Sequence, residues 1–514
     1  MKRSEISEVP PSVDRIIFGS AVIIVLCACL PLLITGDDAG STVTKAYDWI
    51  TLNLGIFYQW AGIAVVIFLS WLAFSRYGKI TLGPQGESAE FSLFSWGSML
   101  FCAGIGAGLM YWSVIEWAYY VEAPPMGAEA HSTEAIEWAA SYGMFHWGPT
   151  AWSIYCFPTL AIAVPHYLRN ENHLRLSIAL REIRIFSNSR GTAARGIDIV
   201  FILALIGGSG TSLGLVTPMI SSVIAKLLNT KVTFGMEVLV LLFCMIIFCS
   251  SVSLGLDKGI RKLSTVNVYG LLGLLAFVLL AGPTLFILRM STDSLGFMMQ
   301  HTLRMITWTD PIDRTGFIES YTVFYWAWWI AYAPFVGLFV ARISKGRTIQ
   351  EVIVGMIVLG SAGCSLLYMV FGNYALSVEL EGRLAFTTIM NEQGPGTAIA
   401  EVFGTLPLAP FILLVFAAIA VIFTATTYDS ASYALAAAAT EQRSPDDEPA
   451  QWHRAFWAVG LVVLPITLMF VDNQKLVLSA TMIVSLPLLV LSIPMGWSLM
   501  KSLRCHLGQI TEEE

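Results

Sequence analysis

The chain has 514 residues, of which 56% are hydrophobic and only 13% are charged, and its net charge is −7. Soluble globular proteins carry about 25% charged residues, so this composition excludes an ordinary soluble enzyme. Apolar stretches of about 20 residues recur along nearly the whole chain and predict an all-α, polytopic protein of the lipid bilayer. We expect no soluble catalytic domain and no nucleic-acid partner.

The apolar stretches predict twelve membrane-spanning helices. In chain order they are 14–35, 53–74, 91–120, 134–167, 196–227, 234–255, 263–289, 316–342, 348–374, 406–437, 455–471 and 476–500. The first has no small-residue cleavage site, so we expect a retained helix rather than a signal peptide. Of the 29 Lys and Arg residues, 21 fall in segments on the same side as the N-terminus. This bias predicts a multi-pass protein of the inner (plasma) membrane with both termini in the cytoplasm.

Two of the predicted spans contain residues that break helices. One carries the glycine-rich sequence AGIGAGLM at 103–110, and the other carries Pro334 and Gly337 within an aromatic segment. Broken helices are tolerated where the freed backbone lines a cavity, and corresponding breaks in two halves of a transporter point to its central site. Close helix packing is the alternative explanation of the glycines.

The two breaks also suggest how the chain is organised. Each opens a group of five spans, and a five-helix group reverses its orientation when it is repeated, so the groups would form an inverted repeat. The predicted parts are a cytoplasmic N-terminus (1–13), two extra helices (14–90), a first repeat (91–290), an outer amphipathic helix and loop (291–315), a second repeat (316–500) and a short cytoplasmic tail (501–514). The amphipathic helix is expected to lie on the membrane surface.

Aromatic residues crowd the sequence YTVFYWAWWIAY at 321–332. Rings four residues apart share a helix face, and ring faces are natural ligands for a quaternary ammonium, which has no N–H to donate. A second cluster, FHWGPTAW at 145–152 with Tyr155, and the pair Tyr119 and Tyr120 could complete a cage. The alternative is an aromatic belt at the membrane interface, which would use one or two rings at a helix end.

Hydroxyl and carbonyl oxygens could bind a cation near this cage. Thr424, Thr426 and Thr427 lie on one later span, and an unwound segment at 102–105 would free backbone carbonyls. Together these oxygens could coordinate Na⁺. Threonines in membrane helices, however, usually donate to their own backbone.

Ionisable residues inside membrane spans are costly and therefore candidates for function. Glu116 and Asp429 are the clearest, with His146 beside Trp147. For Glu116, a structural hydrogen-bond partner and a proton relay are both open, and a lone His146 is more often a packing residue than a ligand. The eight cysteines show no CxxC spacing, and no phosphate-binding loop or hydrolase motif occurs, so neither an enzyme nor a cofactor is expected.

These pieces, in this order, resemble the betaine/choline/carnitine transporter (BCCT) family over about residues 14–500. The most specific are FYWAWW at 324–329, ARISKGR at 341–347 and FHWGP at 145–149, with the glycine-rich 103–110 in support. The resemblance implies a fold similar to the leucine-transporter type, with two inverted five-helix repeats after two extra helices, and alternating access. It also implies a homotrimer, in which the helix at 291–306 would make the contact between subunits.

The resemblance further implies substrate-binding residues. By position, Trp147, Trp152, Tyr155 and Trp329 look like the cage of the sodium/betaine symporters. Similarly, the pocket of the carnitine/γ-butyrobetaine antiporters matches Tyr119, Trp147, Trp328, Trp329 and Tyr332. Tyr332 departs from the symporter branch, where a Trp is usual, and leaves the substrate open.

Coupling residues look more like the ion-coupled branch, because the triple glycine, Val336, Thr427 and Asp429 are all present. The expected Na⁺ ligands are Cys102, Ile105, Phe423, Thr426 and Thr427, some through carbonyls. A second sodium site would use Thr211 and Phe335, but Gly207 stands where the family pattern has another hydroxyl. The glycine series lacks an Asp suited to a net cation, which favours a zwitterion, and the short acidic tail predicts little osmotic activation.

The sequence therefore predicts Na⁺-coupled symport of a betaine-type quaternary ammonium or sulfonium zwitterion by alternating access. Alternatives are a Na⁺-independent antiporter of carnitine-like compounds and proton-coupled choline uptake through Glu116 or Asp429. A gated channel or ligand sensor is a different class, but no ring of like charges and no signalling domain supports it.

Overall fold

The computed structural model describes residues 12–35, 37–84, 86–103, 106–169, 171, 175–254, 259–441, 448–470 and 474–513. The described residues form an all-helical protein, with two isolated β-bridges, Val13–Thr440 and Thr81–Thr348. Its α-helices are α1 (Arg15–Thr35), α2 (Asp37–Phe74), α3 (Leu93–Ala103), α4 (Ala107–Glu122), α5 (Thr133–His146), α6 (Pro149–Leu168), α7 (Thr192–Leu228), α8 (Phe234–Leu254), α9 (Gly259–Ala281), α10 (Thr284–Thr307), α11 (Val323–Ile343), α12 (Ile349–Gly355), α13 (Ser361–Leu367), α14 (Asn373–Leu380), α15 (Phe386–Gln393), α16 (Pro395–Gly404), α17 (Ala409–Ala438), α18 (Gln451–Phe470) and α19 (Gln474–Glu513).

Short 3-10 and π segments join or interrupt these helices. The 3-10 segments are η1 (Arg76–Lys79), η2 (Leu176–Leu180) and η3 (Arg184–Phe186), and the π segments are η4 (Ile318–Thr322), η5 (Met356–Gly360) and η6 (Tyr368–Gly372). The three π segments continue directly into α11, α13 and α14, so these parts of the chain stay helical but locally widened.

Eight helices in the described part of the chain are long and apolar enough to cross a membrane, and two bent helix pairs would raise the number to ten. Ten of the twelve predicted spans thus have a counterpart. The predicted span 134–167 is instead divided into α5 and α6. The predicted span 234–255 corresponds to α8, whose apolar part, Phe234–Ser250, is shorter than a membrane-crossing helix.

Burial separates central helices from peripheral ones. In the most apolar window of α7, and in that of Ile318–Ile343, 78% of the residues are buried, whereas the corresponding share for α1 is 22%. Large apolar side chains on α2, such as Leu52 and Trp60, remain exposed, as expected of a surface that faces lipid. The central helices therefore hold the residues from which a site could be built.

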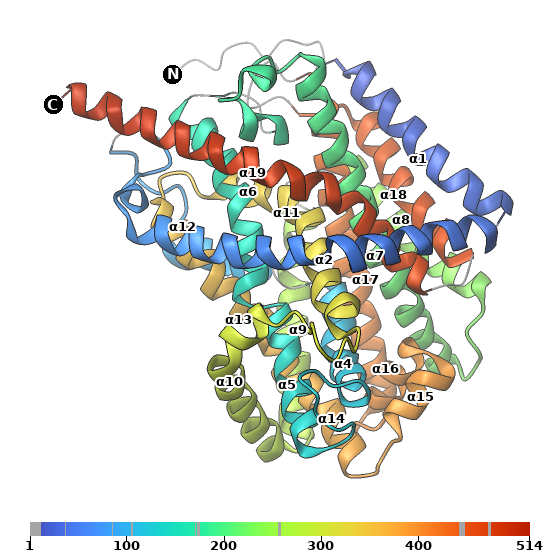
Figure 1. Ribbon diagram of the computed structural model, residues 1–514. Helices are drawn as coiled ribbons and strands as arrows, with labels where there is room; N and C mark the ends of the chain where they lie inside the picture. Colours follow the sequence, from blue (N-terminus) through green and yellow to red (C-terminus); the bar gives the residue numbers. More distant parts are fainter. Residues whose placement is uncertain are drawn as a thin grey trace.

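The predicted amphipathic helix 291–306 is longer in the structure. Helix α10 begins at Thr284, and it turns by 110° from the preceding helix at Gly282 and Pro283. Proline has no N–H to continue the ladder of α9, which explains why the chain turns here rather than at 291. Figure 1 places α10 at the opposite end of the molecule from the C-terminal end of α19.

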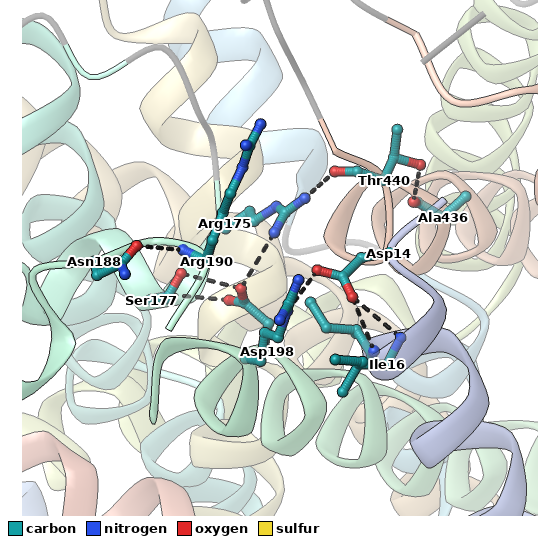
Figure 2. A network of polar contacts seen from close by, with 11 residues as sticks. Asp14, Ile16, Arg175, Ser177, Asn188, Arg190, Asp198, Ala436 and Thr440 are labelled. Carbon is teal, nitrogen blue, oxygen red and sulfur yellow. Dashed lines mark hydrogen bonds and ion pairs between the residues drawn. The ribbon is translucent and has the colours of Figure 1, made fainter. Parts of the chain in front are cut away.

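A polar network joins segments that are far apart in the sequence (Figure 2). Asp14 caps α1 by accepting hydrogen bonds from the N–H groups of Ile16 and Ile17, and it pairs with Arg195 of α7 at 2.8 Å. Arg175, in the connection between α6 and α7, donates to the carbonyl of Thr440 after α17.

The same network holds a buried carboxylate on α7. Asp198 is 0% exposed and lies 3.7 Å from Arg175, and it accepts hydrogen bonds from the N–H and hydroxyl of Ser177 at 3.1 and 3.0 Å. A charge this deeply buried is tolerated because it is paired and hydrogen-bonded. The network therefore connects α1, α7 and the segment that follows α17.

Candidate functional site

The glycine-rich segment is broken, as the sequence predicts. Helices α3 and α4 are bent by 58° relative to each other, and Gly106 is the N-cap of α4 without any side-chain hydrogen bond to the first turn. Residues 104 and 105 lie outside the described part of the chain, so the predicted ligand Ile105 is not placed. The break leaves amide groups at the start of α4 without helical partners.

A cavity lies where α4 begins and where α6, α7, α11 and α17 come together. Its lining residues are Ala103, Gly106, Ala107, Gly108, Leu109, Trp147, Ala151, Trp152, Tyr155, Ser212, Val216, Trp328, Trp329, Tyr332, Phe335, Val336, Cys364, Thr424, Thr427 and Tyr428. The cavity has a volume of about 140 Å³, several times the space that one water molecule occupies. Six of the seven predicted substrate-binding residues therefore line this one cavity.

The rings on the wall stand at steep angles to one another. Trp147 meets Trp329 with ring centres 4.6 Å apart and planes at 73°, and Tyr155 meets Trp329 at 5.6 Å and 76°. Trp152 is perpendicular to Tyr155 at 5.5 Å, whereas Trp328 lies parallel to Trp329 at 5.4 Å. The rings of Trp147, Tyr155 and Trp329 thus form a corner, which presents both ring faces and ring edges to the cavity.

The break between α5 and α6 explains how Trp147 reaches this wall. Pro149 is the first residue of α6 and has no N–H, so the ladder of α5 cannot continue through it. A side chain at Gly148 would come within 2.3 Å of the Met144 carbonyl, so only glycine fits there. Trp147 is consequently the C-cap residue of α5, and its ring lies on the cavity wall.

Comparison with known proteins decides what kind of protein this is. The family model described as BCCT, betaine/carnitine/choline family transporter, matches residues 16–507. The chain belongs to the BCCT family. The chain is also 32% identical over 492 residues to a carnitine transporter of Acinetobacter baumannii, a match that covers 95% of this chain and 88% of the relative.

Membership fixes the general activity. This BCCT chain is a multi-pass membrane protein and a secondary transporter of betaine-, carnitine- or choline-type quaternary ammonium compounds, and not an enzyme. The buried aromatic cluster on the cavity wall is the feature of the structure that suits such a substrate.

Tyr119 is the predicted substrate-binding residue that the BCCT structure does not bring to the cavity. It lies near the end of α4, with its ring centre 6.4 Å from that of Trp112 and 6.2 Å from that of Tyr321. The cavity instead meets α4 at its first turn, several turns earlier.

The predicted sodium ligands of the BCCT chain are only partly assembled. Thr427 lines the same cavity as the start of α4. The hydroxyl of Thr426, however, donates to the carbonyls of Ile422 and Phe423 at 3.0 and 3.1 Å, within its own helix. Cys102 lies near the end of α3 and is half-buried; it does not line the cavity itself, although its neighbour Ala103 does.

The predicted second sodium site is divided between two places. Thr211 is fully buried and is directed at α19, with its hydroxyl 2.7 Å from the carbonyl of Val477 and 2.6 Å from the hydroxyl of Thr481. Phe335 lines the cavity. A side chain at Gly207 would come within 2.7 Å of Val484, so close packing against α19 accounts for the missing hydroxyl there.

Sequence reasoning missed several residues around the cavity. Cys364 and Ser212 line the cavity, and Gly360 backs it, because a side chain at Gly360 would come within 2.2 Å of the ring of Trp152. The sequence GSAG at 360–363 could have indicated this position, because a run of small residues in a membrane helix is typical of close packing against a neighbouring helix or side chain.

Proposed function

We propose that the chain is a Na⁺-coupled symporter of a betaine-type quaternary ammonium or sulfonium zwitterion that works by alternating access. The observation that carries the proposal is the cavity lined by Trp147, Trp152, Tyr155 and Trp329. A methylated onium head has no N–H, so it gains little from hydrogen-bond acceptors but is attracted by aromatic ring faces. These four rings would hold the head, with Trp328 and Tyr332 completing the wall.

The ion would bind between the α3–α4 break and α17. The proposed ligands are Cys102, Ile105, Phe423, Thr426 and Thr427, of which Thr427 faces the cavity. An ion held there would connect the broken helix to α17 next to the substrate. Ion and substrate would then stabilise the same conformation, which couples their transport. Thr426 donates its proton to its own helix, which leaves the lone pairs of its oxygen for the ion.

The finer architecture is also part of the proposal. We infer twelve membrane helices arranged as two inverted five-helix repeats after two extra helices, with both termini in the cytoplasm. A homotrimer would form through α10, which exposes Leu285, Leu288, Met299 and Leu303 on one side and buries Met298 and Met305 on the other.

Proton-coupled choline uptake is a second candidate, and one observation favours it. Asp429 is 1% exposed, and neither of its carboxylate oxygens has a hydrogen-bond partner within the described part of the chain. Its nearest cation is Arg454 at 3.8 Å. A buried carboxylate with so little support is a candidate for binding a proton or a cation during transport.

A binding experiment separates these functions. Titration of the purified protein with glycine betaine, choline and the tertiary amine dimethylglycine, each in NaCl and in KCl, would give six affinities. We expect the tightest binding for glycine betaine in NaCl. Equal binding of dimethylglycine would contradict the onium cage, whereas tightest binding of choline without a sodium effect would favour the second candidate.

A further inference from the structure

A group of buried polar side chains lies directly behind the aromatic wall. Glu116 of α4 and His146, the last residue of α5, are both 0% exposed, and their side chains approach to 3.3 Å. Tyr120 donates its hydroxyl proton to one carboxylate oxygen of Glu116 at 2.5 Å, and Tyr368 donates to the other. The carboxylate is therefore buried but satisfied by phenol groups.

The direction of each hydrogen bond in this group follows from the available protons. The Tyr120 oxygen also lies 2.9 Å from Nδ1 of His146, and Nε2 of His146 lies 3.0 Å from the hydroxyl of Thr322. Because Tyr120 gives its single proton to Glu116, its oxygen accepts from Nδ1–H. A neutral His146 then accepts at Nε2 from Thr322, and both ring nitrogens are held.

His146 connects this group to the cage through its backbone. Its carbonyl accepts a hydrogen bond from Nε1 of Trp329 at 2.9 Å. That carbonyl is free because α5 ends at His146. The ring of Tyr325 stacks on the ring of His146 at 4.7 Å and on the ring of Trp329 at 5.8 Å, which adds a second link between the two residues.

The bond to His146 distinguishes Trp329 from its neighbours. Within the described part of the chain, Nε1 of Trp147 and Nε1 of Trp328 are buried without a hydrogen-bond partner. Trp329 is also the ring that touches both Trp147 and Tyr155 at the cavity corner. The position of this one indole therefore sets the width of the corner.

We propose that His146 is a positioning residue for the onium cage: its ring, held at both nitrogens, fixes the carbonyl that orients Trp329. The proposal rests on the proposed function, since it assumes that the Trp329 corner holds the onium head. Loosening His146 would widen the corner and weaken binding of the head, while the later steps of transport would keep their rates.

The test measures the substrate concentration for half-maximal uptake and the maximal rate, with glycine betaine as the probe, in proteoliposomes. His146→Ala keeps the backbone carbonyl but removes the ring that fixes it. We expect it to raise the half-saturating concentration by up to about tenfold, as if the Trp329 hydrogen bond were lost, with the maximal rate within about twofold. His146→Asn, whose amide can donate to Tyr120 as Nδ1 does, should recover most of the affinity.

Two further variants keep the test decisive if His146→Ala does not fold. Thr322→Val keeps the shape of the side chain but removes the partner of Nε2, and it should raise the half-saturating concentration about threefold. Thr51→Val is the matched control, because Thr51 is buried in α2 and donates to Tyr47 and Asp48 of its own helix. It should leave the affinity unchanged.

The outcomes separate this proposal from the proposed function. If Trp329→Ala leaves the affinity for glycine betaine unchanged, the cage itself is refuted. If Trp329→Ala weakens binding but His146→Ala and Thr322→Val do not, only the positioning role is overturned. A loss of maximal rate with unchanged half-saturation in the His146 variants, without rescue by His146→Asn, would also overturn it.

Discussion

The two sides of the cavity differ in how firmly their binding groups are held. On the aromatic side, Trp147, Trp152 and Trp329 are buried and packed ring against ring, and Trp329 is hydrogen-bonded to His146. On the α17 side, the hydroxyls of Thr424 and Thr426 donate into their own helix, and Thr427 is the one described ligand of the first predicted sodium site that lines the cavity. The aromatic side is therefore preorganised, whereas the ligands predicted for an ion on α17 are only partly brought to the cavity.

The largest effect should come from breaking the preorganised side. Trp329→Ala removes the ring that touches both Trp147 and Tyr155. A desolvated cation–π contact contributes about 2 kcal/mol or more, so the affinity for glycine betaine should fall at least about 30-fold, measured by uptake or titration. Trp60→Ala, at a ring that is 58% exposed on α2, should have no effect, and an equal loss there would contradict the cage.

The oxygen-bearing side should respond through sodium rather than through substrate. Thr427→Ala should raise the sodium concentration for half-maximal uptake about tenfold, since it removes the hydroxyl of a residue that lines the cavity. Thr426→Ala should raise it about threefold, because that hydroxyl already has acceptors in its own helix. The reverse order would mean that the Thr426 oxygen contributes more to ion binding than that of Thr427, and no effect of either would remove both from the ion site.

A smaller change should follow from altering Tyr332, which lies between the two sides. Its hydroxyl is 3.4 Å from that of Ser209, at the long end of hydrogen-bond distances, so Tyr332→Phe should change the affinity for glycine betaine by less than about twofold. Gly208→Ala should do more, because the added methyl would come within 3.0 Å of the Tyr332 ring. Uptake assays on both variants test whether the ring or the hydroxyl matters.

The smallest effect on substrate affinity should come from the polar network of Figure 2. Asp198→Ala breaks a buried pair with Arg175, and removing one partner of such a pair costs about 3–5 kcal/mol of stability. We expect a lower midpoint of thermal unfolding but an unchanged half-saturating concentration in the protein that remains folded. A changed substrate affinity would mean that this network, too, is coupled to the cavity.

Residue spacing made the aromatic side predictable from the sequence. The rings of Trp328 and Tyr332 are one helical turn apart, and Gly148 with Pro149, which the predicted span 134–167 passed over, marks the break that turns Trp147 inward. Both signals are local, because they depend on helix periodicity and on the missing N–H of proline. The all-helical, multi-pass character followed in the same way from hydropathy.

The remaining features depend on contacts between distant segments. Nothing local shows that Tyr368 reaches Glu116, that Gly360 makes room for Trp152, or that Thr211 faces α19. The sequence also does not show whether the Thr426 oxygen, whose proton goes to its own helix, is directed at the cavity. Tyr119 lies too far along α4 to reach the cavity, which only the position of the α3–α4 break reveals.

The most direct test of Na⁺-coupled symport is uptake of labelled glycine betaine into proteoliposomes with an inward Na⁺ gradient, compared with an equal K⁺ gradient. We expect accumulation above the external concentration with Na⁺ and simple equilibration with K⁺. Uptake that requires internal substrate and is the same with either ion would contradict symport, and it would make the chain an exchanger in which Thr426 and Thr427 are structural hydroxyls.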